Sequence, residues 1–165
     1  MDVHVKEFYR QFSDETPDGK FHRVIALHEA PDIDWNYLHE QFPKVCKGWY
    51  ELTLFDSADR IEFTRDYWLS KLPYRPKVNE ALLRFFDSLD DVGIYIYQEK
   101  FDDPFDVDIV YSLKDNAGFF RGAPAATEAQ IESLKTAFSD PLPADYIAFL
   151  QIHGGFCKTT DCTGL

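Results

Sequence analysis

The sequence lacks the features that mark several large classes of protein. No stretch approaches the roughly 20 apolar residues that a membrane-spanning helix needs. The first residues also lack the apolar run of a secretory signal peptide. The chain has only three cysteines, an odd number without framework spacing, which favours a reducing compartment over a disulfide scaffold. We therefore expect a cytoplasmic protein that does not bind a membrane.

Catalytic motifs are also missing. The chain contains no G-x-S-x-G elbow, no G-x-x-x-x-G-K-[ST] loop and no G-x-G-x-x-G fingerprint. Its one double glycine, Gly154-Gly155, follows a predicted helix instead of preceding one, which favours a helix stop over a phosphate site. These patterns predict a protein without a cofactor and without a catalytic residue.

Basic residues are scarce. The chain has 17 Lys and Arg residues against 29 Asp and Glu residues, which gives a net charge of −12. Such a chain is a poor candidate for binding nucleic acid and a better one for binding a basic protein. Hydrophobic residues make up 45% of the 165 residues and aromatic residues 16%. This composition supports a folded core and excludes a disordered chain.

The spacing of apolar residues predicts a mixture of helices and strands. The predicted strands cover residues 21–28, 49–55, 92–97, 106–113 and 119–121. The predicted helices cover residues 34–42, 56–72, 76–89, 127–138 and 143–153. Because strands and helices do not alternate strictly, we predict an α+β fold with a mixed or mostly antiparallel sheet packed by several amphipathic helices. We expect a single domain over residues 1–165, with the small-residue segment 122–126 as a candidate internal boundary.

Start signals support these helices. Asp34 can cap the helix that follows it, and Asp56 or Ser57 can cap the next one. Pro76 suits the first turn of a helix. Thr127 with a glutamine three residues later forms a capping box.

The most acidic segment runs from residue 87 to residue 108. It contains eight acidic residues and one lysine, so these 22 residues carry −7 of the net charge, and aromatic residues are interleaved with them. Such a segment can steer a basic partner and supply aromatic anchors. The predicted partner-binding residues are Asp102, Asp103, Asp106, Asp108, Tyr95 and Tyr97. A solvated loop between two strands, with its aromatic residues in the core, is the alternative; either way we expect Phe101 and Phe105 to point in opposite directions.

Two groups of residues could hold a metal in an alternative hypothesis, a metal-dependent enzyme of unknown substrate. His28 and His39 are each followed by a glutamate, but they lie eleven residues apart, which does not fit the two histidines of a zincin helix. His153, Cys157 and Cys162 could supply soft ligands, although a structural zinc site needs a fourth. Cys157 with His153 as base could also act as a nucleophile. Surface histidines and unpaired thiols are the simpler explanation, so we predict no metal site.

The C-terminal part of the chain carries a distinctive pattern. Pro143 can occupy the first turn of a helix in which Tyr146, Phe149, Leu150 and His153 share one face. Gly154 can then supply a left-handed residue that ends the helix. We expect four residues of this segment in the core: Leu142, Tyr146, Phe149 and Leu150.

This pattern resembles the signature of the SMI1/KNR4 (SUKH) superfamily. The matching parts, in order, are an amphipathic helix at 127–138, Leu142-Pro143, Asp145-Tyr146, Phe149-Leu150 and His153-Gly154-Gly155. The resemblance covers residues 127–156 and marks 127–165 as a SUKH-like segment. It implies a non-enzymatic module that binds a protein. Many members of the superfamily look like immunity proteins that neutralise secreted toxins, often nucleases, and the yeast namesakes are regulators that act through protein contacts.

Overall fold

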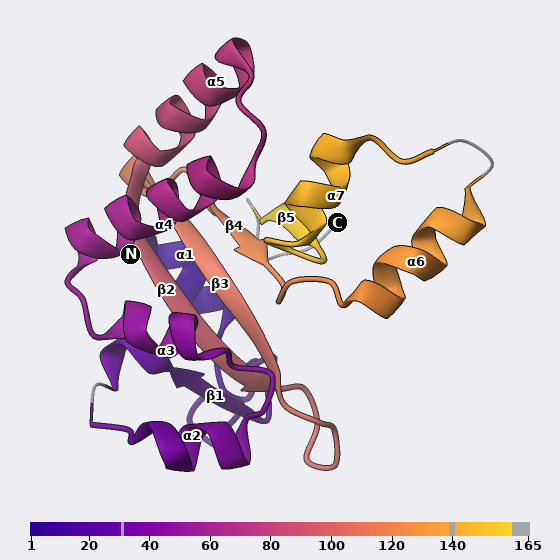
Figure 1. Cartoon of the computed structure of the whole chain (residues 1–165). Helices are drawn as coiled ribbons and strands as arrows, with labels where there is room; N and C mark the ends of the chain where they lie inside the picture. Colours follow the sequence, from indigo (N-terminus) through magenta and orange to yellow (C-terminus); the bar gives the residue numbers. More distant parts are fainter. Residues whose placement is uncertain (31, 139–140, 160–165) are drawn as a thin grey trace.

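The computed structural model describes residues 1–30, 32–138 and 141–159. It has an antiparallel five-stranded sheet in the order β1-β2-β3-β4-β5, so the predicted α+β class is confirmed. In Figure 1, α3, α4 and α5 lie over one face of the sheet and α1 lies behind it. The strands are β1 (Arg23–Ala26), β2 (Leu89–Gln98), β3 (Asp106–Leu113), β4 (Phe119–Gly122) and β5 (Phe156–Thr159). The α-helices are α1 (Val3–Phe8), α2 (Trp35–Gln41), α3 (Lys47–Thr53), α4 (Ser57–Lys71), α5 (Pro76–Asp87), α6 (Glu128–Ala137) and α7 (Ala144–Leu150).

The long strands β2 and β3 form a hairpin at the centre of the sheet. Ile94 pairs with Ile109, and β4 and β5 then add to the free side of β3. Because side chains alternate along a strand, each strand serves both faces of the sheet. Ile94 and Ile109 belong to the larger core cluster beneath α4, whereas Tyr95 and Val110 belong to the smaller cluster beneath α1.

A buried ion pair anchors α4 to the start of β2. Arg60 donates from Nη2 to Asp91 Oδ1 at 2.6 Å and from Nε to the Val92 carbonyl at 2.6 Å. Both charged side chains are nearly shielded from solvent, with exposures of 9% and 12%. A charge at this depth is tolerated because its partner and further hydrogen bonds satisfy it.

The predicted helix starts are confirmed. The Asp34 carboxylate caps α2, and the Asp56 carboxylate caps α4. Pro76 opens α5, and Thr127 forms both halves of the capping box with Gln130 at the start of α6. These signals act within one helical turn, so the local sequence is sufficient to set them.

Three parts of the predicted order are wrong. Residues 49–55 were expected as a strand, but α3 covers most of them, and neither α1 nor β5 was predicted. Trp49 and Leu52 lie three residues apart and pack toward the main core from one side of α3, so packing overrides the strand propensity of this run. The strand expected over 21–28 is shorter, because Leu27–Glu29 form a 3-10 turn after β1.

The SUKH-like segment also differs from expectation. Helix α7 follows Pro143, and Leu150 is buried, but Tyr146 is 45% exposed and is not a core residue. Gly154 is not left-handed, since Gly118 is the glycine with positive φ among the described residues. Instead, the Gly154 N–H donates to the Pro124 carbonyl at 2.9 Å, and a Cβ there would lie only 3.0 Å from that oxygen. Close backbone approach explains this glycine.

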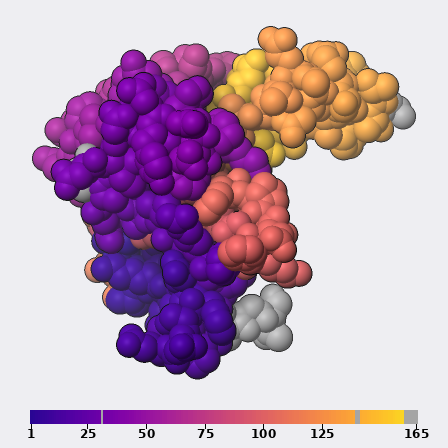
Figure 2. All heavy atoms as spheres, turned by 90° about the horizontal axis from the view of Figure 1, so that it is seen from below, coloured from indigo at the N-terminus to yellow at the C-terminus, as the bar shows by residue number. Residues whose placement is uncertain are grey.

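Residues 122–126 connect β4 to α6, and β5 returns to pair with β4. Figure 2 shows α6, in orange, projecting from the side of the molecule. Ile131 is the one buried residue of this helix. None of the helices in the described ranges combines the length and the apolar character needed to cross a bilayer.

Candidate functional site

The structure separates the six residues predicted to bind a partner. Asp102 and Asp106 are exposed, and Asp103 is half-buried. Asp106 forms an ion pair with Lys44. Tyr97 is half-buried against the smaller core cluster. Asp108 and Tyr95 are buried, with exposures of 6% and 4%, and therefore do not form part of the surface. The prediction that Asp108 and Tyr95 lie on the binding surface is therefore wrong. The prediction that the exposed acidic residues bind a partner stays a prediction.

The tip of the β2–β3 hairpin presents an aromatic side chain among acids. Phe101 is 73% exposed, whereas Phe105 packs edge-on against Phe42 at 4.8 Å, so the expected opposite orientation of Phe101 and Phe105 is confirmed. Gln98 donates from Nε2 to the carbonyls of Phe101 and Asp103 at 2.7 and 2.8 Å. These bonds fix the loop, which holds Phe101 outward. We define Glu99, Phe101, Asp102 and Asp103 as the hairpin tip.

Asp108 belongs to a polar cluster between α1 and the sheet. The Tyr9 hydroxyl donates to Asp108 Oδ2 at 2.6 Å, and Arg121 Nη1 approaches the same oxygen at 3.4 Å. Tyr95 stacks on Tyr9 with 4.2 Å between ring centroids. Burial raises the pKa of the Asp108 carboxyl, although the bonds from Tyr9 and Arg121 oppose that shift. This cluster holds α1 in place.

The described residues of the metal hypothesis do not meet. His28 is half-buried beside β2, where its Nδ1 accepts the Ile94 N–H at 3.2 Å, and His39 is exposed on α2. His153 is buried, whereas Cys157 is exposed on β5 and accepts from Arg121. Cys162 lies outside the described residues. Within the part of the chain that the structure describes, no three His, Cys, Asp or Glu side chains converge to hold a metal ion.

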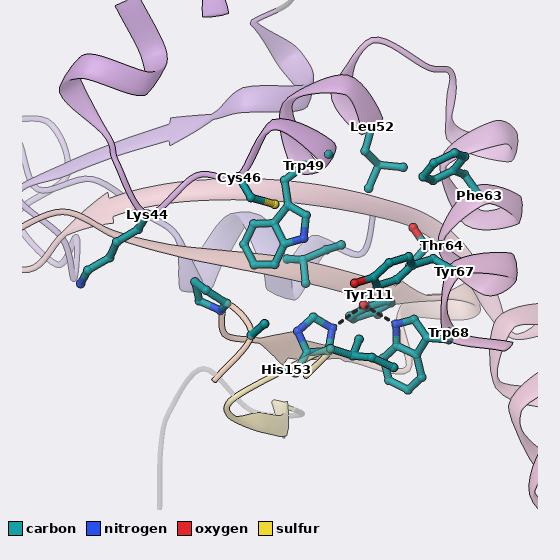
Figure 3. Close-up of a pocket in the computed structure, with 15 residues that line it drawn as sticks. Lys44, Cys46, Trp49, Leu52, Phe63, Thr64, Tyr67, Trp68, Tyr111 and His153 are labelled. Atoms are coloured by element: carbon teal, nitrogen blue, oxygen red, sulfur yellow. Dashed lines mark hydrogen bonds between the residues drawn. The ribbon is translucent and has the colours of Figure 1, made fainter. Parts of the chain in front are cut away.

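One cavity lies where α3, α4 and β3 meet the residues around 124 and 153. Its volume is about 420 Å³. Figure 3 shows the side chains around this pocket. Aromatic and aliphatic side chains from four separate segments line it: Trp49, Leu52, Phe63, Tyr67, Tyr111 and His153. Phe63 and Tyr67 are 54% and 41% exposed, so they form an open rim.

A chain of hydrogen bonds forms part of the pocket wall. His153 Nδ1 lies 2.7 Å from the Ala123 carbonyl, which can only accept, so the proton belongs on Nδ1. His153 Nε2 therefore accepts from the Tyr111 hydroxyl at 2.6 Å, and the Tyr111 oxygen accepts from Trp68 Nε1–H at 3.0 Å. Figure 3 shows these bonds as dashed lines. The three side chains thus satisfy one another without a net charge.

Burial keeps His153 neutral. Desolvation lowers the pKa of its imidazole to about 4, and the bond to Ala123 offsets only part of that effect. Gly122 makes room for the ring, since a Cβ at this position would lie 2.5 Å from His153 Cε1. Both ring nitrogens are engaged, so His153 acts as a structural link between β3 and the SUKH-like segment.

Comparison with protein-family models, with curated proteins and with solved structures finds no match to this chain. The pocket has apolar walls, and both ring nitrogens of its histidine, His153, are hydrogen-bonded within the protein. The hairpin tip offers an exposed aromatic ring framed by carboxylates. Both arrangements suit binding.

The sequence analysis predicted the helix over 56–72 that carries Trp68 and singled out His153, but it did not bring these two residues together. Tyr111 carried no local signal, because it reads as one residue of a strand. The pocket joins residues from positions 49, 67, 111 and 153, and no local pattern encodes such a meeting. The 3.6-residue period of α4 indicates that Trp68 faces the core. The residues that Trp68 contacts there depend on how the strands are arranged.

Proposed function

We propose that the chain is a protein-binding module of the SMI1/KNR4 (SUKH) type that contacts a basic protein through the hairpin tip. The supporting observation is the exposed Phe101, held outward by the Gln98 hydrogen bonds and flanked by Glu99, Asp102 and Asp103. A rigid aromatic side chain loses little entropy on binding and can fill an apolar hollow in a partner. The carboxylates around it favour a partner whose hollow is rimmed by Lys and Arg.

The resemblance gives the proposal its finer form, an immunity-like inhibitor or a regulator. A toxin nuclease binds nucleic acid through a basic surface. An acidic protein with an aromatic anchor can cover such a surface and exclude the phosphate backbone. The net charge of −12 increases the rate of association with a basic partner.

The test is a capture experiment at low and high salt from a lysate of the source organism, with bound proteins quantified by mass spectrometry. The wild-type chain should capture one basic protein, and capture should fall at high salt because the contact is electrostatic. Changing Phe101→Ala, or Glu99→Gln with Asp102→Asn and Asp103→Asn, should remove that protein. Asn at 103 keeps an oxygen that can accept the Lys100 N–H, so the loop should be retained.

Matched controls separate the hairpin tip from general charge. A triple variant with Glu40→Gln, Glu80→Gln and Glu132→Gln removes the same charge from three exposed helix positions and should capture the partner normally. Phe138→Ala removes a phenylalanine that is 55% exposed elsewhere. If the control variants lose the partner as fully as the hairpin variants, the hairpin tip is not the contact. A captured nuclease whose activity the chain inhibits would support the inhibitor form over the regulator form.

A further inference from the structure

The pocket beneath Phe63 and Tyr67 is separate from the hairpin tip and has the properties of a small-molecule site. Its volume of about 420 Å³ falls within the range of about 300–1,000 Å³ typical of such sites. Trp49 and Tyr67 reach across it from α3 and α4 (Figure 3). Flat aromatic walls of this kind favour a planar ring that can stack against them.

Two hydrogen-bond donors of the pocket are not used by the fold. Among the described residues, neither the Trp49 indole N–H nor the Tyr67 hydroxyl has a hydrogen-bond partner in the protein, whereas the neighbouring Trp68 indole N–H donates to Tyr111. In Figure 3 the Trp49 nitrogen and the Tyr67 oxygen are turned toward the middle of the pocket. A ligand with an acceptor atom would satisfy a donor that is otherwise left to water.

The charges of the residues that line the pocket restrict the chemical class of its ligand further. None of the described residues that line it is an Asp or Glu, so a cation would find no carboxylate counter-charge among them. Lys44, at one end, is paired with Asp106 and points away from the middle of the pocket (Figure 3), so an anion would gain little. His153 is neutral and both of its nitrogens are engaged.

We propose that this pocket binds a small, uncharged aromatic molecule that carries a hydrogen-bond acceptor. The ring stacks between Trp49 and Tyr67, and the acceptor receives a hydrogen bond from one of their two donors. The open rim at Phe63 is the entrance. This site does not depend on the hairpin contact, so either proposal can fail without the other.

Quinoline is a suitable probe, because it is planar, uncharged at pH 7.5 and carries one acceptor nitrogen. Its binding can be followed by NMR on the indole N–H resonances of the three tryptophans. The Trp49 resonance should shift in a saturable manner as quinoline is added. The Trp35 resonance should not move, since Trp35 lies away from the pocket against His39 and Tyr50; a Trp35→Phe variant assigns it.

Gly48 allows the pocket to be narrowed without disturbing the core. It lines the pocket, and a Cβ at this position would meet no atom within 4 Å. Gly48→Leu should weaken quinoline binding by about tenfold or more. Gly48→Ala, the matched control, should bind like the wild type. Equal binding by both variants would place the probe elsewhere and overturn the proposal.

Two further arms test the chemistry of the ligand. Tyr67→Phe keeps the ring but removes one donor, so quinoline binding should weaken by about two- to tenfold. N-methylquinolinium has the same shape with a positive charge and no acceptor, and it should bind at least about tenfold more weakly than quinoline. A Trp49 resonance that quinoline leaves unmoved, or a tighter complex with N-methylquinolinium, would overturn the proposal.

Discussion

The two faces of the sheet solve the same problem, a polar group inside a core, in different ways. On the face under α4, Trp68, Tyr111 and His153 satisfy one another as neutral groups. On the face under α1, Asp108 accepts hydrogen bonds from Tyr9 and Arg121. Both solutions rely on the same strand, β3, whose side chains alternate between the faces.

The difference between the two faces follows from how deeply their polar groups are buried. Tyr111 and His153 are almost completely buried, and a charge there would have no access to water. The Arg121 side chain is 26% exposed and lies over the Phe8 ring at 4.5 Å, so part of its charge stays solvated. Tyr111 and His153 are therefore neutral, whereas the charge of Arg121 lies near an edge. Charged side chains that are buried, such as Arg60, Asp91 and Asp2, are paired or hydrogen-bonded.

The largest effect should come from the Arg60–Asp91 ion pair. Arg60→Met leaves a buried carboxylate without its cation and should lower the free energy of unfolding by about 3–5 kcal/mol. The matched change on the α1 face, Arg121→Met, should cost about 1 kcal/mol, because that pair is partly solvated and Asp108 keeps Tyr9. Urea unfolding measures both. Equal losses would show that depth does not separate the two faces.

The second prediction concerns pH. His153 has a pKa of about 4 in the fold against an ordinary value of 6.5, so below pH 6.5 the unfolded chain binds a proton that the fold does not. Stability should therefore fall as pH drops from 6.5 toward 4, by roughly 3 kcal/mol at most. The difference between the wild type and His153→Asn isolates this effect. NMR should show His153 neutral down to about pH 4.

Asp108 should change the stability with pH in the opposite direction to His153. Burial raises the pKa of its carboxyl above the ordinary 3.8, so the fold holds a proton that the unfolded chain has already lost. Its contribution should therefore diminish as pH rises from 3.8 through the raised pKa. Asp108→Asn removes that trend. A wild type and variant with parallel pH profiles would contradict the assignment.

A smaller effect separates the two buried tyrosines. Tyr111→Phe leaves both Trp68 N–H and His153 Nε2 without a partner, and the loss of both hydrogen bonds should cost about 2–3 kcal/mol in total. Tyr9→Phe leaves Asp108 with Arg121 and should cost about 1 kcal/mol. Thermal and urea unfolding compare the two. A greater loss for Tyr9→Phe would reverse the order proposed for the two faces.

The smallest change in stability is expected at Gly48, in the open pocket, and it can be compared with a change at Gly122 in the packed core. Gly48→Ala places a methyl group in open space on α3 and should stabilise the chain by about 0.5–1 kcal/mol. Gly122→Ala drives a methyl group into the His153 ring and should destabilise it by about 1–3 kcal/mol. Two changes of the same sign would mean that the pocket wall is packed like the core.

Local signals in the sequence predicted much of the fold. The caps of α2, α4 and α6 are set within one helical turn, and the alternation of β2 is visible because strand periodicity is local. The helix α3 was mistaken for a strand, because its Trp, Tyr and Leu residues suit either structure and only packing decides. Asp108 and Tyr95 were expected on the surface, since an acidic segment does not show which of its strand residues faces a helix.

By itself, the sequence determined the α+β class, the helix starts, the acidic charge and the apolar faces. All of these arise from interactions between residues a few positions apart or from composition. The tertiary structure decided that Phe101 points outward, that His153 meets Tyr111 and Trp68, and that a pocket opens between Trp49 and Tyr67. These features depend on which strands pair and which helix lies over them. Such contacts join residues far apart in the chain and are fixed only when the whole core packs.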